Sequence, residues 1–129
     1  MLVVPTQIRP SSIHGSGVFL LVPVKKGDLI WRFDSRIDRV YSQSEIDSLP
    51  ELAAKFITHH AELHRTTGVW ILSGDNARYI NHSDSPATLS MGIGFADDLA
   101  ARDLEIGAEL TSDYRTTNDK TWPPPEYAI

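Results

Sequence analysis

The stretch that decides the fold is residues 78–86, Arg-Tyr-Ile-Asn-His-Ser-Asp-Ser-Pro. It places Asn81, His82 and Ser83 in one short segment, and their side chains offer several hydrogen-bond donors and acceptors. Taken alone, the stretch is equally compatible with a loop that uses Asx-turn chemistry and with a ligand-binding loop. The segments on either side of it decide between these interpretations.

Two further segments carry unusual combinations of residues. Residues 14–19, His-Gly-Ser-Gly-Val-Phe, indicate a tight turn that feeds a strand, and the glycines would also let a backbone approach a ligand closely. No third glycine and no helix follow, so this is not a dinucleotide-binding fingerprint. Residues 107–114, Gly-Ala-Glu-Leu-Thr-Ser-Asp-Tyr, end on Tyr114, and a tyrosine at the end of a strand more often serves packing than catalysis.

In this order and at these separations, the three segments resemble the signatures of the SET-domain family of protein lysine methyltransferases. The resemblance spans residues 12–115 and includes residues 101–106, which are similar to the A-x-R-D-I stretch that follows a strand between the second and third signatures. The matching positions are Gly15, Gly17, Val18, Phe19, Arg78, Tyr79, Ile80, Asn81, His82, Ser83, Pro86, Gly107, Glu109, Leu110, Thr111, Asp113 and Tyr114.

The resemblance implies an α+β, mainly β fold of small curved sheets with a C-terminal pseudoknot. We expect one SET domain over residues 1–129, with a core at 12–115, a helical insert at about 42–66 and an extended tail at 116–129. It also implies an S-adenosylmethionine-dependent enzyme that methylates the amine of a lysine in a protein or peptide. The Asn81-His82 strip should then lie beside residues 109–114.

Residue roles carry over from the family in three groups. Tyr114 would face the transferred methyl group. Phe33, Tyr79, Tyr114 and Trp122 would line the channel for the lysine side chain, although Trp122 could equally pack elsewhere on the surface. The cofactor would contact Gly15, Ser16, Gly17, Val18, Phe19, Arg78, Asn81, His82, Tyr114 and Trp122, with Arg78 and Asp113 supporting the site.

Three positions depart from the family pattern. Asp84 replaces the usual cysteine and Ala87 the usual asparagine, which puts one hydrogen bond of the loop in question. Phe33 replaces a tyrosine whose hydroxyl commonly lines the lysine channel. These departures favour an alternative, a catalytically silent SET-like binding module. A methyltransferase for a non-histone protein or a small amine is a third interpretation.

The secondary structure predicted from the pattern is mostly short strands. A hairpin of residues 18–24 with 29–33 is expected, then a helix opened by the capping box of Ser42 and Glu45. Apolar residues at steps of three and four between positions 52 and 63 predict a second helix that ends near Gly68. Strands are expected at 69–72, 89–95 and 99–104, with a proline-rich extended tail from Thr116.

Composition limits the partners. The 129 residues suit one domain, and the absence of cysteine excludes disulfides, thiolate-bound zinc and a cysteine nucleophile. A net charge of -5 disfavours nucleic acid and favours a basic peptide. There is no secretory signal and no apolar run of roughly 20 residues, which predicts a cytoplasmic protein without a membrane segment. A homodimer and a monomer are both compatible with so short a chain.

No metal site is expected. His60 and His64 would share a face if the helix reached both, but a nearby third ligand is missing. We expect these histidines, with His59, to be solvated or to face the substrate.

Overall fold

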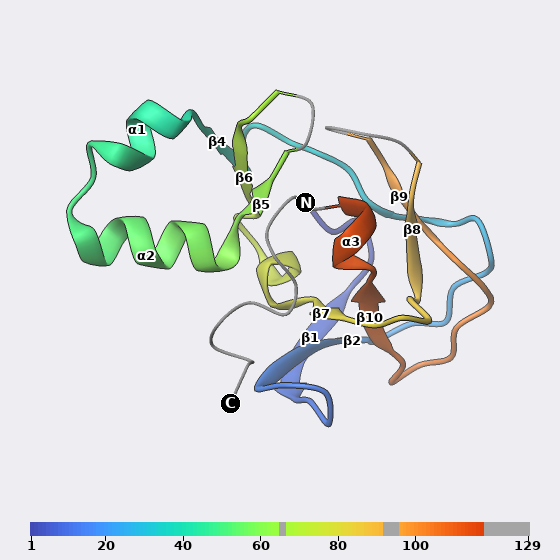
Figure 1. Ribbon diagram of the computed structural model, residues 1–129. Helices are drawn as coiled ribbons and strands as arrows, with labels where there is room; N and C mark the ends of the chain where they lie inside the picture. Colours follow the sequence, from blue (N-terminus) through green and yellow to red (C-terminus); the bar gives the residue numbers. More distant parts are fainter. Residues whose placement is uncertain (65–66, 92–95, 118–129) are drawn as a thin grey trace.

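The protein folds into small sheets joined by irregular segments, with the helices gathered mostly in one insert (Figure 1). This computed structural model describes residues 1–64, 67–91 and 96–117. The strands are β1 (Thr6–Pro10), β2 (Ser16–Leu20), β3 (Leu29–Trp31), β4 (Arg39–Tyr41), β5 (Glu62–Leu63), β6 (Trp70–Leu72), β7 (Asn81–His82), β8 (Thr88–Ser90), β9 (Asp98–Ala100) and β10 (Glu109–Ser112). The helices are α1 (Gln43–Asp47), α2 (Glu51–His60), the 3-10 helix η1 (Asn76–Tyr79) and α3 (Tyr114–Thr117).

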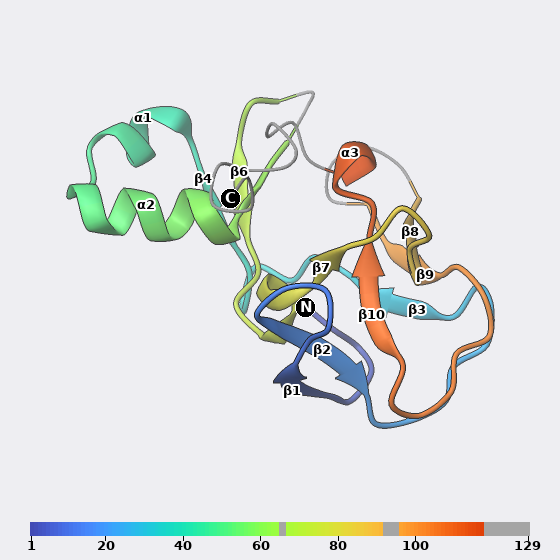
Figure 2. The same cartoon turned by 60° about the horizontal axis from the view of Figure 1, so that its bottom comes forward.

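Strand β10 organises the sheet that matters most for function. The strand order in that sheet is β1-β2-β10-β7, so β10 lies between a strand from the start of the chain and one from its middle (Figure 2). It runs antiparallel to β2 and parallel to β7. The other two sheets have the orders β3-β9-β8 and β4-β6-β5. This mainly β arrangement of small sheets confirms the predicted fold class.

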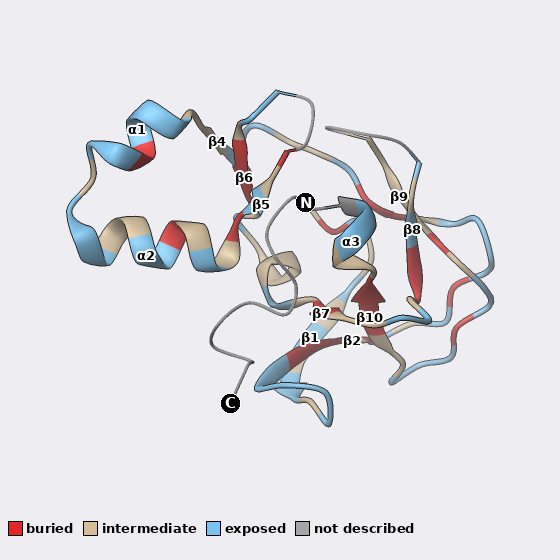
Figure 3. Ribbon diagram, in the orientation of Figure 1, coloured by how far each residue is buried: buried red, intermediate tan, exposed pale blue. Residues whose placement is uncertain are grey.

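The main core lies beneath β2 and β10. Val18, Leu20, Ile30 and Leu110 have no exposed surface, and burying an aliphatic side chain of this size contributes about 1.5–3 kcal/mol. Val18 and Leu20 point to the same side of β2 because side chains alternate along a strand. In Figure 3 most of β2 and β10 is coloured as buried.

The helical insert has a small core of its own. Ile46 of α1 and Ile57 of α2 pack with Ala61, Trp70 and Leu72, so both helices cover the β4-β6-β5 sheet. The predicted capping box is confirmed at its first residue, since the Ser42 hydroxyl accepts the backbone N–H of Glu45 at 3.1 Å.

The second helix ends earlier than predicted. It stops at His60, and Ala61 has an extended backbone with ψ of 152°. Leu63 then pairs with Trp70 in the antiparallel β5–β6 ladder. Ala61 and Leu63 fit the helical spacing of apolar residues, but they pack on the insert's core from an extended segment. Their apolar side chains are therefore accommodated without continuing the helix.

The predicted hairpin of residues 18–24 with 29–33 is wrong. Strand β2 pairs with β1 and β10, whereas β3 pairs with β9. Pro23 lacks a backbone N–H, and Val24 makes only an isolated bridge to Leu104. The chain therefore leaves the first sheet at Leu20, and β1, which the pattern did not reveal, provides the antiparallel partner.

The remaining predicted strands are shorter than expected. Strand β6 lies within residues 69–72, and β8 and β9 form an antiparallel pair that overlaps only the first two residues of each segment expected at 89–95 and 99–104. Strand β9 begins at Asp98, one residue before the segment expected at 99–104. Residues 92–95 lie outside the described part of the chain.

The C-terminal segment begins as a helix. Thr116 belongs to α3, so the tail is not extended from that residue, and positions 118–129 lie outside the described residues. Among the residues that are described, the helices are too short or too polar to cross a membrane.

Candidate functional site

The three segments singled out in the sequence meet at β10. Glu109 and Leu110 stand opposite Phe19 and Val18 of β2, and Thr111 and Ser112 stand opposite Asn81 and His82 of β7. Tyr114 follows two residues after β10. The expectation that the Asn81-His82 strip lies beside residues 109–114 is therefore confirmed.

Asn81 ties two of the segments together through its amide. The side chain is only 5% exposed, and its Nδ2 donates to the carbonyl oxygens of His14 and Ser16, each at 3.0 Å. The same nitrogen lies 3.1 Å from Oε1 of Glu109. Since these contacts occupy the Nδ2 hydrogens, any ligand contact of Asn81 must use its Oδ1 or its backbone. Asn81 thus fixes the shape of the glycine turn.

Gly17 is required by packing. A Cβ at this position would lie 2.2 Å from Oε1 of Glu109 and 3.0 Å from Cβ of Ser11. The carboxylate cannot simply retreat, because Oε1 also accepts the Ser11 hydroxyl at 2.8 Å and the Asn81 amide. Gly17 was predicted for its backbone approach to a cofactor, and the structure adds a second reason for glycine there.

Gly15 is required by backbone conformation. Its φ of +45° is in the left-handed region that favours glycine, and nothing lies within 4 Å of the place where a Cβ would be. Residues 14–16 are exposed, so the backbone of the turn is accessible to a ligand. Val18, by contrast, is fully buried in the core, and only its backbone could contact a ligand.

His82 and Tyr114 lie against each other. The backbone N–H of Tyr114 donates to Nδ1 of His82 at 3.1 Å, and the two ring centroids are 5.5 Å apart in an edge-to-face arrangement. The Tyr114 hydroxyl donates to the carbonyl oxygen of Ile80. Both ends of the tyrosine are therefore held by the strip that contains Asn81 and His82.

Charged groups surround this pair on the side of α3. Arg115 contacts Asp113 through Nη2 at 2.8 Å and Asp84 through the same nitrogen at 3.0 Å. Hydrogen bonds from Arg115, first of all from its side chain, lower the pKa of Asp113. Asp84 Oδ1 in turn lies 3.0 Å from Nε2 of His82.

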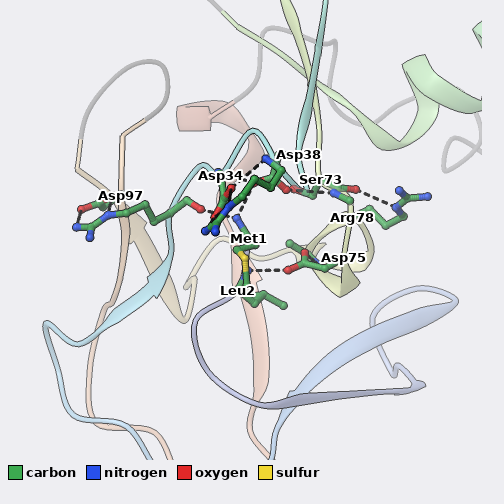
Figure 4. Close-up of polar contacts among 12 residues, drawn as sticks. Met1, Leu2, Asp34, Asp38, Ser73, Asp75, Arg78 and Asp97 are labelled. Atoms are coloured by element: carbon green, nitrogen blue, oxygen red, sulfur yellow. Dashed lines mark hydrogen bonds and ion pairs between the residues drawn. The ribbon is translucent and has the colours of Figure 1, made fainter.

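A buried carboxylate positions the segment that leads into β7 (Figure 4). The Asp38 side chain has no exposed surface and accepts the backbone N–H of Gly74 at 3.1 Å and that of Asp34 at 3.0 Å. It also binds the Met1 amine at 2.6 Å. Asp38 thereby joins the β3–β4 connection to the β6–η1 connection.

Asp75 caps η1 from the same cluster. One carboxylate oxygen accepts the backbone N–H of Ala77 at 3.1 Å, and the other accepts that of Leu2 at 2.8 Å. A capping carboxylate satisfies backbone donors that a helix start leaves without partners. The cluster drawn in Figure 4 therefore fixes where η1 begins, and η1 leads directly into β7 and Asn81.

Arg78 and Tyr79 face the helical insert. Arg78 donates through Nε to the carbonyl oxygen of Ser73 at 3.0 Å, and its guanidinium lies 5.6 Å from the ring centroid of Phe56. The Tyr79 ring meets His60 of α2 edge-to-face at 5.6 Å. Both residues connect the insert to the main sheet, and their predicted contacts to cofactor and lysine remain predictions.

The other aromatic residues predicted to contact the cofactor or the lysine are Phe33, Phe19 and Trp122. Phe33 packs on the main core and meets Trp31 edge-to-face, with centroids 6.5 Å apart. Phe19 lies under the guanidinium of Arg9, which is 4.2 Å from its ring centroid. Trp122 lies outside the described residues, so its contacts with the lysine channel and the cofactor remain predictions.

The structure shows how the loop is held with Ala87 in place of the family's usual asparagine. The side chain is 1% exposed within the main core, and its backbone N–H donates to Thr111 Oγ1 at 2.9 Å. The Thr88 hydroxyl donates to the Thr111 carbonyl oxygen, also at 2.9 Å. Backbone and threonine groups thus connect this loop to β10 without an asparagine.

His60 and His64 do not lie on one helix, so they do not form the pair that a longer helix would give. His60 is the last residue of α2, and His64 follows β5, where its Nδ1 contacts the Thr67 hydroxyl at 3.0 Å. His64 is buried, so the expectation that it is solvated is wrong. No group of three metal-binding side chains occurs among the described residues.

Sequence reasoning missed three contributors to the site. Ser11 holds the Glu109 carboxylate, Asp38 anchors the approach to β7, and Arg115 bridges two carboxylates beside Tyr114. Each is a single polar residue outside a motif, and only the folded chain gives it a partner. Of these three residues, only Arg115 could have been noticed in the sequence, because it directly follows the third segment.

The comparisons with known proteins agree with this geometry. The SET domain family model matches residues 15–115, so the chain belongs to the SET-domain family. No curated protein matches the chain.

Solved structures share the fold at low identity. A humanized mutant of the Chaetomium thermophilum Polycomb Repressive Complex 2 bound to an inhibitor is 17% identical, with a TM-score of 0.68 over 91% of this chain. An apo ctPRC2 with two substitutions in Ezh2 is 18% identical, with a TM-score of 0.68 over 90%. A ctPRC2 in an autoinhibited conformation bound to S-adenosylmethionine is 17% identical, with a TM-score of 0.67 over 91%. In each case the match covers 16% of the other chain.

Proposed function

We propose that this protein is an S-adenosylmethionine-dependent methyltransferase that transfers a methyl group to the amine of a lysine in a protein or peptide. The observation that carries the proposal is the meeting of the glycine turn, the Asn81-His82 strip and Tyr114 around β10. Membership of the SET-domain family supports the reaction class. The net charge of -5 supports a basic peptide as the substrate.

The residues present fit S-adenosylmethionine. The exposed turn at residues 14–16 offers backbone groups, with open space where a Cβ of Gly15 would be. His82 and Tyr114 are partly exposed and could border the same ligand. In this proposal the turn and the Asn81-His82 strip hold the cofactor, which supplies an activated methyl group on a sulfonium.

The main chemical task for the protein is to present a neutral amine. A free lysine has a pKa of about 10.4, so deprotonation at pH 7 costs about 4.6 kcal/mol. An apolar channel lowers this cost because burial disfavours the ammonium form. Phe33 and the ring of Tyr114 would supply apolar channel walls, and alignment of the amine with the methyl group would supply much of the remaining acceleration.

Tyr114 would orient the amine. Its hydroxyl hydrogen is directed at the Ile80 carbonyl oxygen, so the hydroxyl oxygen can accept a hydrogen bond from the substrate amine. Because Phe33 has no hydroxyl, one fewer group would restrain the amine than in a channel with tyrosine at that position. The number of methyl groups transferred should therefore depend strongly on Phe33.

The test is mass spectrometry of lysine-containing basic peptides incubated with the protein and S-adenosylmethionine. We expect a mass gain of about 14 Da for each methyl group, located on lysine by fragmentation. The Tyr114→Phe variant should lose at least about tenfold in turnover while its affinity for the cofactor changes little. Cofactor binding without any peptide methylation would favour the silent binding module instead.

A further inference from the structure

The structure assigns a role to Asp84, which we propose is a positioning residue for the candidate site. In this proposal Asp84 fixes the ring of His82 and, through that ring, the backbone of Tyr114. The inference rests on the proposed function, because it concerns how this chain holds the residues that would bind the cofactor. Asp84 itself is placed beside the site and not in contact with the reacting atoms.

The first step is the protonation state of His82. A backbone N–H can only donate, and the N–H of Tyr114 lies 3.1 Å from Nδ1 of the ring. Nδ1 must therefore be the nitrogen without a proton, and the neutral ring carries its hydrogen on Nε2. Asp113 Oδ1 is 3.8 Å from Nδ1, beyond hydrogen-bond length, and this oxygen already accepts from Arg115 at 2.8 Å.

The second step is the direction of the other hydrogen bond. An ionised carboxylate can only accept, and Asp84 Oδ1 lies 3.0 Å from Nε2. The ring therefore accepts from Tyr114 on one side and donates to Asp84 on the other. A hydrogen bond at each nitrogen fixes both the tautomer and the rotation of an imidazole.

The third step is what holds Asp84. Its side chain is 81% exposed, so a single contact there would be weak. Arg115 Nη2 contacts Asp84 Oδ1 at 3.0 Å and Asp113 Oδ2 at 2.8 Å, and it thereby joins the two carboxylates. Asp113 and Arg115 flank Tyr114 in the chain, so the path from Tyr114 through His82, Asp84 and Arg115 returns to its starting point.

The consequence is that one exposed carboxylate supports the site from outside. Losing it would remove the acceptor that Nε2 of His82 has in Asp84 and a carboxylate that contacts Arg115. The ring could then rotate, and the start of α3 would lose one of the contacts that fix Tyr114 beside β7. Neither effect requires the core beneath β10 to change, so the fold should survive.

The experiment compares the wild-type protein with Asp84→Ala and Asp84→Asn, using Asp47→Ala as a matched control on the surface of α1. Ring nitrogen chemical shifts of His82 are measured by NMR without cofactor, and affinity for S-adenosylmethionine is measured by calorimetry. In the wild type we expect Nε2 protonated and Nδ1 accepting. Asp84→Ala should mix the tautomers and weaken cofactor binding by about threefold to tenfold.

Asp84→Asn should retain most of the ring signature, because its side-chain oxygen still accepts from Nε2. Asp47→Ala should match the wild type in both measurements. An unchanged His82 spectrum or unchanged cofactor affinity in Asp84→Ala would overturn the proposal. If the wild type binds no S-adenosylmethionine at all, the proposed function fails, and the NMR spectra alone then decide whether Asp84 positions His82.

Discussion

Replacing Gly17 with alanine tests the packing that shapes the candidate site. The new Cβ would lie 2.2 Å from Oε1 of Glu109, so the carboxylate must move. It would then lose its hydrogen bonds to the Ser11 hydroxyl and the Asn81 amide. Hydrogen bonds to a charged group contribute about 1.5–3 kcal/mol each, and partial exposure of Glu109 places these at the low end. Gly17→Ala should therefore reduce the free energy of unfolding by about 2–4 kcal/mol.

The assay is a double-mutant cycle measured by urea denaturation. In the Glu109→Ala background the obstructing carboxylate is gone, and the contact with Ser11 Cβ at 3.0 Å remains. Gly17→Ala should then cost less than about 1 kcal/mol, which leaves a coupling of more than about 1 kcal/mol between the two positions. An equal cost of Gly17→Ala in both backgrounds would refute the reasoning, since the glycine would then be required for something other than the Glu109 carboxylate.

The remaining predictions concern buried carboxylates. Burial raises the pKa of Asp98 to about 6 from an ordinary 3.8, and at about 1.36 kcal/mol per pH unit this corresponds to at most about 3 kcal/mol. The folded protein then binds more protons than the unfolded chain between pH 3.8 and 6, so Asp98 makes the free energy of unfolding fall as pH rises through that window. Asp98→Asn should be more stable than wild type at pH 7 and lose this part of the pH dependence in urea titrations, and a less stable variant at pH 7 would contradict it. Asp38→Asn should lower stability by about 2–4 kcal/mol, because its NH₂ group would face the N–H of Gly74 or of Asp34. Thermal unfolding compared with the exposed control Asp28→Asn checks this, and equal midpoints for the two variants would argue against a buried anchor.

The sequence predicted which segments meet at β10 better than it predicted the sheets. Asn81, His82 and Tyr114 belong to segments with an unusual order and spacing, and the parallel pairing of β7 with β10 brings them together as expected. Strand pairing was less predictable. β1 has little apolar alternation of its own, so nothing in its residues marked it as the partner of β2.

Other features depend on tertiary contacts that no local pattern contains. The end of α2 at His60 follows from the pairing of β5 with β6, in which half-buried Leu63 stands opposite Trp70 and which competes with helix continuation. Asp38 belongs to no motif in the sequence. Its importance is visible only in the folded chain, where the backbone N–H groups of Gly74 and Asp34 donate to its side chain. The close approach of Glu109 to Gly17 likewise requires the antiparallel β2–β10 register.

The most direct test of the account is an NMR titration of the ¹⁵N-labelled protein with S-adenosylmethionine, read as changes in backbone amide shifts. The account predicts a saturable response concentrated in three separate stretches, residues 14–19, 81–84 and 112–115. A protein whose amides in these stretches do not respond, or respond only at positions far from β10, would contradict the claim that the three segments form one cofactor site.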